Sequence, residues 1–351
     1  MLYSSNSMVE SPKQTRDEGV RLKMTYDLSF IPSSIAQYLL DEIPIFRSPK
    51  TIQIFLLRQT HDYSIFRTEE TRELNVAVLP ESISSRKPST KVAMLASKQK
   101  APESRQFHTL VRGAASDTKR LDKDQQQCEL KDNLCMRCPR CALFGAVSTE
   151  KGRGKGRWNI RHRIEYSTAY SLERWEEISE IVTFNAVSSV SQSTGQALGY
   201  TETVAPLANF PSVVTLTSTT KEEFCAYLKT LISCKSYGAE TRTKGDMVNL
   251  IVGIAGGYEE LMTPLEYNLA LSERDYQADP IKNTYEIEEE FRRFAAFADK
   301  IAILKPKEVE SLIDGVRKLE FSNEFINKMY TDAENFAKEV EKWAKEESGG
   351  G

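Results

Sequence analysis

The sequence has no long hydrophobic run and little histidine. Its longest apolar stretch, Met247 to Ile254, is too short to cross a bilayer. The N-terminal residues include no apolar segment of the kind found in signal peptides. We therefore expect a cytoplasmic protein that does not contact a membrane. With only 3 histidines and no Walker loop, G-x-S-x-G or H-E-x2-H pattern, the sequence also lacks common catalytic motifs.

The charge balance is nearly neutral in total but uneven along the chain. The 351 residues carry a formal net charge of -3, which is ordinary for a globular protein. Residues 273–351 contain 19 acidic and 13 basic residues, so the acidic surplus lies at the C-terminal end. The length predicts either a large core with insertions or two domains. A polyanionic partner would be indicated by a local concentration of positive charge and not by the total.

Six cysteines are present, and four of them are clustered. They form the pattern C-x6-C-x2-C-x2-C at Cys128, Cys135, Cys138 and Cys141. Thiolates two residues apart on a tight turn can bind one metal ion, and Zn²⁺ in structural sites takes four such donors in a tetrahedron. We therefore predict a structural zinc site at these four residues.

Two alternatives to this zinc site remain open. His108 could replace Cys128 as the fourth ligand, or the cysteines could bind an iron–sulfur cluster, because C-x2-C-x2-C is part of a ferredoxin pattern. That pattern continues through three more residues to a fourth cysteine followed by proline, and this sequence has Gly145 at the position of that cysteine. A catalytic zinc is not expected, since no histidine stands in the H-x-E pattern of nucleobase deaminases.

A basic segment follows the cysteine cluster. Residues 151–163 (KGRGKGRWNIRHR) contain six Lys or Arg and no acidic residue. Glycines let the backbone approach phosphates, cations neutralise them, and a tryptophan gives a surface on which an unpaired base can stack. The alternative is a solvated loop whose charges only keep it soluble. The candidate nucleic-acid contacts of this segment are Lys151, Arg153, Lys155, Arg157, Trp158, Arg161 and Arg163.

The apolar pattern predicts an α+β fold. Alternation over Val20 to Ile31 indicates a half-buried strand. A strand, a helix and a strand at 211–217, 220–233 and 247–254 favour a ferredoxin-like, RRM-like antiparallel sheet with helices on one face. The expected core at 20–270 has insertions at 81–105 (a flap or loop), 117–163 (the cysteine cluster and basic segment) and 183–210 (an extended β-hairpin), and an acidic helical segment follows at 273–347.

Smaller groups of cationic residues flank the expected strands. Taken singly, each is more often an exposed side chain than a ligand. If the sheet forms as expected, they could line one of its faces. These residues are Arg58, His61 and Arg67 near the first strands, and Arg242 and Lys244 before Gly245.

Three stretches resemble one known protein family. They are LLRQTHDYSIFRTEETRELN (Leu56 to Asn75), CMRCPRCALFGAV (Cys135 to Val147) and GAETRTKGDMVNLIVGIAGG (Gly238 to Gly257). Together they resemble the major backbone subunit of type I-D CRISPR interference complexes, which belongs to the repeat-associated RNA-binding superfamily with a ferredoxin-like core. The likeness extends over residues 21–267, and the acidic C-terminal segment is less diagnostic.

This resemblance implies a non-catalytic RNA-binding protein. Members of the family stack head to tail along a guide CRISPR RNA, grip its backbone in a basic palm and present its bases for pairing with target DNA. The implied palm residues are Arg58, Arg67, Arg242 and Lys244, the implied thumb is the hairpin at 187–205, and the cysteine cluster is a zinc-binding insertion. The implied partners are guide RNA, target DNA through that guide, further copies of the chain and other subunits.

Two other functions are compatible with these residues. A metal-dependent nuclease would shorten single-stranded RNA or DNA when Mg²⁺ is present, whereas a guide-RNA scaffold would bind the RNA intact. An interaction module stabilised by zinc, with the acidic C-terminal segment as its binding surface, would not bind RNA at all.

Overall fold

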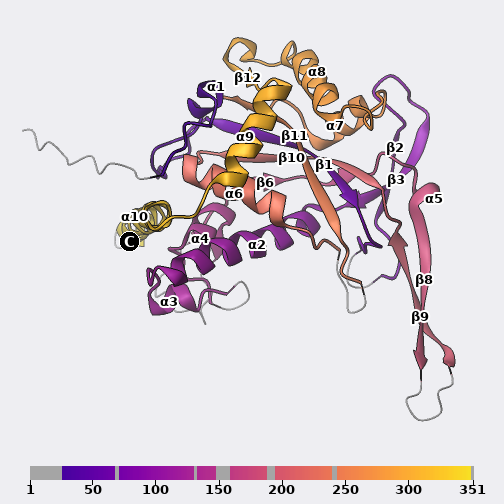
Figure 1. Ribbon diagram of the computed structural model, residues 1–351, viewed down its shortest axis with the longest axis horizontal. Helices are drawn as coiled ribbons and strands as arrows, with labels where there is room; N and C mark the ends of the chain where they lie inside the picture. Colours follow the sequence, from indigo (N-terminus) through magenta and orange to yellow (C-terminus); the bar gives the residue numbers. More distant parts are fainter. Residues whose placement is uncertain are drawn as a thin grey trace, which may run out of the picture.

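The secondary structure combines a central sheet, two groups of helices and a projecting hairpin (Figure 1). The computed structural model describes residues 26–67, 71–129, 133–147, 159–187, 194–238 and 243–348. The strands are β1 (Thr51–Thr60), β2 (Val76–Pro80), β3 (Pro88–Met94), β4 (Ala146–Val147), β5 (Asn159–Ile160), β6 (Ile164–Tyr166), β7 (Ala169–Tyr170), β8 (Ser179–Val187), β9 (Thr194–Val204), β10 (Asn209–Thr217), β11 (Met247–Gly257) and β12 (Ala302–Ile303). The helices are α1 (Ser33–Ala36), α2 (Ala96–Asp117), α3 (Lys123–Gln126), α4 (Pro139–Phe144), α5 (Trp175–Ile178), α6 (Lys221–Ser233), α7 (Pro264–Leu271), α8 (Pro280–Arg292), η1 (Ala298–Lys300), α9 (Pro306–Lys318) and α10 (Asn323–Ser348). Within the described ranges, no helix is both long enough and apolar enough to cross a membrane.

The main sheet has five strands in the order β12-β11-β1-β10-β6, and every neighbouring pair is antiparallel. β1 lies in the middle, and nine of its ten residues are buried. A central strand that is covered on both faces needs apolar residues on both, which explains the largely apolar TIQIFLL run at its start, where Gln53 is buried among apolar residues. Two smaller sheets, β2-β3-β7 and β8-β9, extend the architecture at one end.

Two helices connect strands that are not neighbours. α6 joins β10 to β11, which lie on either side of β1, and α2 belongs to the connection from β1 to β6, which lie on either side of β10. The two helices contact each other. α6 begins where the sequence predicts, because Thr220 and Glu223 form a capping box. Thr220 Oγ1 accepts a hydrogen bond from Glu223 N (3.2 Å), and Glu223 Oε2 accepts one from Thr220 N (3.1 Å).

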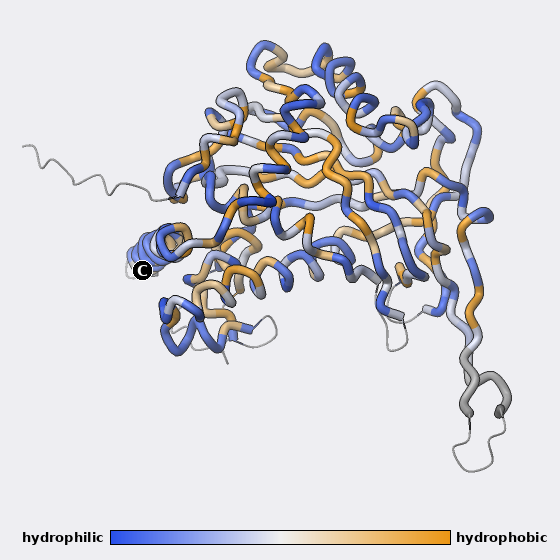
Figure 2. The backbone as a smooth tube through the Cα atoms, viewed as in Figure 1, coloured by the Kyte–Doolittle hydropathy of each residue, from blue (hydrophilic) through white to orange (hydrophobic). Residues whose placement is uncertain are grey.

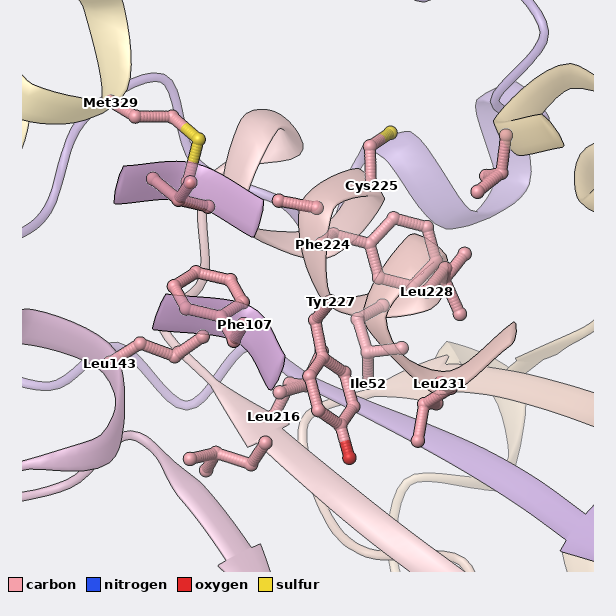
Figure 3. Packing of buried hydrophobic residues seen from close by; sticks show 14 of the residues in the cluster. Ile52, Phe107, Leu143, Leu216, Phe224, Cys225, Tyr227, Leu228, Leu231 and Met329 are labelled. Atoms are coloured by element: carbon pink, nitrogen blue, oxygen red, sulfur yellow. The ribbon is translucent and has the colours of Figure 1, made fainter. Parts of the chain in front are cut away.

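The first face of the sheet carries the larger hydrophobic core. Ile52 of β1 and Leu216 of β10 belong to one cluster with Phe107 of α2, Tyr227 of α6 and Met329 of α10 (Figure 3). Figure 2 shows the same pattern along the backbone, with apolar residues concentrated in the sheet and polar ones along the outer helices. Burial of each such side chain stabilises the fold by about 1.5–3 kcal/mol, which fixes these helices on the sheet.

The second face is also covered by helices, so the expectation of helices on one face alone is wrong. Phe55 of β1 packs with Tyr267 of α7 and Ile287 of α8 in a separate cluster. α8 approaches β11 closely at Gly253, where an added Cβ would lie 2.6 Å from Thr284 Cγ2. The sheet is covered twice because alternate residues of β1 supply apolar side chains to both faces.

An extended hairpin is present where β8 pairs with β9, but it spans 179–204 and not the expected 183–210, because residues 209 and 210 belong to β10. The register runs from Ser179↔Val204 to Val187↔Thr194 and shifts near Asn185. The hairpin projects from the body of the molecule (Figure 1). Its base is anchored, because Trp175 Nε1 donates to Glu202 Oε1 (2.6 Å). Residues 188–193 lie outside the described residues.

Two expectations for the first hundred residues need correction. Within the strand predicted at 20–31, the described part, 26–31, contains turns and coil. The expected flap at 81–105 contains β3, which pairs with β2, and the first turns of α2. Both elements bury polar side chains such as Lys91 and Gln99, which made this stretch look solvated in the sequence.

The acidic C-terminal segment forms helices that pack on the core. α8 contacts β11, α9 contacts α6 and β11, and α10 contacts α2, α4 and α6. The helix α8 begins at Pro280, because Asp279 is its N-cap and accepts from Lys282 N (3.0 Å). It ends at Arg292, and η1 follows at Ala298–Lys300.

A buried carboxyl group on α8 makes stability depend on pH. Neither oxygen of Glu288 has a hydrogen-bond partner among the described residues, and burial raises the pKa of Glu288 well above its ordinary value of 4.5. The folded protein therefore keeps this proton after the unfolded chain has lost it, so the contribution of Glu288 to stability is full below pH 4.5 and falls as pH rises towards the raised pKa. We expect Glu288→Gln to become more stable relative to wild type as pH rises above 4.5, by up to about 1.4 kcal/mol per pH unit. Urea unfolding at pH 5, 6, 7 and 8 measures this difference.

The matched control is Glu310→Gln, which removes an exposed carboxylate on α9. Its free energy of unfolding should follow the wild-type pH profile. A constant difference between Glu288→Gln and wild type at every pH would contradict the raised pKa.

Candidate metal centre and nucleic-acid interface

The four clustered cysteines come together in space. Their sulfurs all lie within 4.8 Å of one another. Cys128 follows α3, Cys138 is the N-cap of α4 and Cys141 lies within α4. Between Cys135 and Cys138 the chain turns at Met136, whose φ of 64° is in the left-handed region. The local spacing therefore produces one compact group, which we call the cysteine knot.

The geometry of the cysteine knot fits one tetrahedral ion. Cys128 Sγ lies 3.8 Å from Cys138 Sγ and 3.7 Å from Cys141 Sγ. Four thiolates at a zinc–sulfur distance of about 2.3 Å are about 3.8 Å apart. A multi-iron cluster distributes its cysteines over several irons and holds their sulfurs farther apart. Cys128, Cys138 and Cys141 are buried and Cys135 is half-buried, as in a closed structural site.

His108 lies outside this group of sulfurs. It is not one of the residues whose donor atoms come together, whereas Cys128 is. Burial lowers the pKa of His108 to about 4, so its imidazole is neutral at pH 7. The geometry therefore favours Cys128 over His108 as the fourth ligand.

Two of the candidate RNA contacts are buried in the core, which corrects their predicted role. Arg58 has no exposed surface, and its Nη1 donates to Glu103 Oε1 (2.7 Å) and Asn249 Oδ1 (2.8 Å). Arg163 is 3% exposed, and its Nη1 donates to Glu223 Oε2 (2.8 Å). Both guanidinium groups neutralise buried carboxylates, so neither is available to a phosphate in this conformation.

Four other candidates lie at or near the surface. His61 is exposed and lies 3.1 Å from Gln59 Oε1 through its Nε2. Arg67 is half-buried and donates to the carbonyl of Thr71. The other two are exposed: Lys244, whose Nζ is 2.6 Å from Asp246 Oδ1, and Arg161, which follows β5.

The remaining candidates fall outside the described residues. They are Lys151, Arg153, Lys155, Arg157, Trp158 and Arg242. The roles of residues 151–158 of the basic segment and of Arg242 in the implied palm therefore stay predictions.

Comparison with known proteins identifies the family. The family model described as Csc2 CRISPR matches residues 38–341. The chain belongs to the Csc2 CRISPR family. The crystal structure of Csc2 from Thermofilum pendens superposes with a TM-score of 0.63 at 19% identity, covering 91% of this chain and 97% of that chain, and shows the same α+β fold. A chain of a "CRISPR RNA-guided surveillance complex, pre-nicking" aligns over 76% of this chain and 100% of its own, with 8% identity and a TM-score of 0.45. No curated protein matches this chain significantly.

In this Csc2 family member, the base of the hairpin holds residues that the sequence analysis did not single out. The guanidinium of Arg72 lies 5.7 Å from the ring centre of Tyr200, which is 48% exposed. Ile181 on the partner strand is 69% exposed. An exposed aromatic ring beside an arginine is a surface on which a base can stack. The sequence offered one signal for this pair, since Arg72 lies in one of the three stretches that resemble the family. The contact between Arg72 and Tyr200 joins residues far apart in the chain, so it could not be seen in the sequence.

Proposed function

We propose that this protein is a non-catalytic subunit that binds CRISPR guide RNA along its backbone. Copies of it, stacked with one another and joined by other subunits, would form the backbone of a type I-D interference complex. The guide bases would then remain free to pair with target DNA. Membership of the Csc2 CRISPR family over residues 38–341 is the observation that carries this proposal.

The projecting hairpin supports a role in holding a strand. Its stem is fixed to the body by Glu202, which accepts from Trp175 Nε1 (2.6 Å) and, through its other oxygen, from Leu74 N (2.7 Å). An anchored arm keeps its position when a flexible polymer lies against it. Arg72 and Tyr200 add a cation and a stacking surface at the base of this arm. This arrangement grips a backbone without reading base sequence.

The sheet and the cysteine knot support the finer structural part of the proposal. The order β11-β1-β10-β6, with α6 and α2 as crossovers, supports a ferredoxin-like sheet. Zinc bound by Cys128, Cys135, Cys138 and Cys141 would cross-link the end of α3 to α4 and would supply structure, not chemistry. The basic segment begins shortly after this cross-link and is the proposed principal contact with phosphates.

The basic segment gives the prediction that tests RNA binding. Arg153→Glu, Lys155→Glu and Arg157→Glu together should weaken binding of unrelated single-stranded RNAs alike, by at least about tenfold. The slope of log affinity against log salt should become shallower by about 2, because each lost phosphate contact accounts for about 0.7 on single strands. Fluorescence anisotropy over a range of salt concentrations measures both quantities.

The control removes the same charge elsewhere, through Arg293→Glu at the C-cap of α8 and Lys307→Glu and Lys318→Glu on α9. This variant should bind RNA like wild type. Equal affinities for the two triple variants would assign the basic segment to solubility or protein contacts. The same RNA incubated with Mg²⁺ should stay intact, and shortened products would favour a nuclease instead.

A further inference from the structure

A solvent-open cavity of 710 Å³ lies between α2 and the chain that leads into the cysteine knot. One wall is formed by α2, with Arg105 and Arg112. The rest of the lining includes Arg140 of α4 and Glu129 beside Cys128. The cavity is within the size range of small-ligand sites in proteins. None of these three arginines belongs to the basic segment or to the implied palm.

The helical repeat of α2 explains why its cations meet in this cavity. Arg105, His108, Thr109 and Arg112 are spaced by three or four residues, which places them on one side of a helix. All four line the cavity. This side of α2 is polar, whereas Phe107 and Val111 point into the core.

The three arginines of the cavity are not neutralised by carboxylates. Arg112 Nη1 donates to the carbonyl of Cys128 (3.4 Å), and Arg140 donates to Ser104 Oγ (3.0 Å) and the carbonyl of Gly145 (3.3 Å). Within the part of the chain that the structure describes, no carboxylate lies within 4.0 Å of any of the three. Other arginines near the cavity, in contrast, form ion pairs with carboxylates.

Two neighbouring arginines show the contrast. Arg120, at the end of α2, pairs with Glu334 (2.8 Å). Arg137, in the cysteine knot, pairs with Asp122 (2.9 Å) and Asp124 (3.1 Å). The lining of the cavity, by contrast, contains three guanidinium groups and one carboxylate, that of Glu129. The formal charges of these four groups sum to +2.

We propose that this cavity binds a phosphate group. A guanidinium presents five N–H donors in a planar fork that matches two phosphate oxygens, so several arginines that line one cavity without a carboxylate partner suit a tetrahedral oxyanion. The phosphate can belong to a nucleic-acid backbone, a source that rests on the proposed function, or be a free anion, which does not. The chemistry is the same for both sources.

A competing role for the arginines is to balance the charge of the metal-bound thiolates. The hydrogen bonds do not favour this role: among the described residues, Cys128 Sγ accepts from Cys135 N, and no arginine of the cavity donates to a sulfur. Arg112 and Arg140 donate to carbonyl oxygens instead. Metal content measured on the same variants separates the two roles.

The test uses the full, metal-loaded chain and titrates inorganic phosphate by calorimetry. Wild type should show saturable binding, and Arg105→Gln with Arg112→Gln should weaken it by at least tenfold without loss of metal. Arg105→Lys with Arg112→Lys keeps the charge but loses the forked geometry. The phosphate affinity of this variant should therefore lie between those of wild type and the glutamine pair. Arg293→Gln with Lys318→Gln removes the same charge from the C-cap of α8 and from α9, and this variant should bind phosphate like wild type.

A second arm measures a short single-stranded RNA by fluorescence anisotropy. If the glutamine pair also weakens RNA binding and phosphate competes with RNA, the phosphate comes from a backbone. If the glutamine pair weakens phosphate binding while its RNA affinity is unchanged, the cavity takes a free anion. If wild type binds phosphate but no RNA, the cavity again takes a free anion, and this result also counts against the guide-RNA function. No saturable phosphate binding by wild type, or equal binding by wild type and the glutamine pair, would overturn the proposal. Loss of metal with phosphate binding intact would assign the arginines to the cysteine knot.

Discussion

The Cys138→Ser variant is expected to lose nearly all of its bound metal and to unfold about 10 °C or more below wild type. Structural zinc contributes about 10–16 kcal/mol of apparent binding free energy to the folding of isolated zinc-finger peptides. Half of that value is already enough for the expected shift, since 1 kcal/mol changes the melting temperature by about 2–4 °C in larger domains. Cys138 is 1% exposed and is the N-cap of α4, so a serine there can neither bind zinc as a thiolate nor reach solvent easily. Metal analysis and thermal unfolding are the measurements.

Cys234→Ser is the matched control, because Cys234 is also buried but is not part of the cysteine knot. It should keep the wild-type metal content. Metal analysis of the wild type also decides between zinc and iron. A Cys138→Ser protein with wild-type metal content and melting temperature would show that these sulfurs do not form the site.

The Glu103→Gln variant is expected to lower the free energy of unfolding by about 3–5 kcal/mol. Glu103 lies on α2 and has no exposed side-chain surface. It accepts hydrogen bonds from Arg58 Nη1 (2.7 Å) and from the hydroxyl groups of Tyr227 (2.6 Å), Tyr166 (2.7 Å) and Tyr237 (2.9 Å). A neutral amide would leave the guanidinium of Arg58 as an uncompensated charge in the core, which is the costly way to break a buried ion pair. Urea unfolding at pH 7 measures the loss.

Two further variants make this result interpretable. Asp314→Asn breaks an ion pair with Arg317 in which both side chains are about 60% exposed, and it should change stability by less than about 0.5 kcal/mol. Replacing Arg58 and Glu103 together by methionine removes both charges, so it should cost less than Glu103→Gln alone. A loss for Glu103→Gln no larger than that for Asp314→Asn would show that the buried pair does not hold α2 in place.

Much of the sheet could be predicted from sequence because its signals are local. β10, α6 and β11 each combine a regular apolar pattern with a clear boundary, such as the capping box of Thr220 and Glu223. α2 was not recognised because its buried side includes Gln99, Glu103 and Ser104, which interrupt the apolar stripe. These polar residues are buried because partners from distant strands satisfy them, and no local pattern carries that information.

The candidate site divides in the same way. The cysteine knot could be predicted because its four ligands lie within fourteen residues and their spacing fixes the turn. Arg58 was misread as a surface cation because its partner Glu103 is 45 residues away. The arginines of the α2 cavity were missed because their shared face exists only once that segment is known to be a helix. Side chains that act through distant partners require the fold.

The position of β1 also determines the order in which the molecule can be completed during synthesis. Its two neighbours, β10 and β11, pair Thr51 with Thr217 and with Gly257, so the central strand has no partner until more than 150 further residues have been made. The cysteine knot needs only nearby residues and can close much earlier. A nascent chain whose cysteine knot has closed would therefore still expose the apolar faces of β1, and such non-local pairing is slow and prone to aggregation until the later strands arrive.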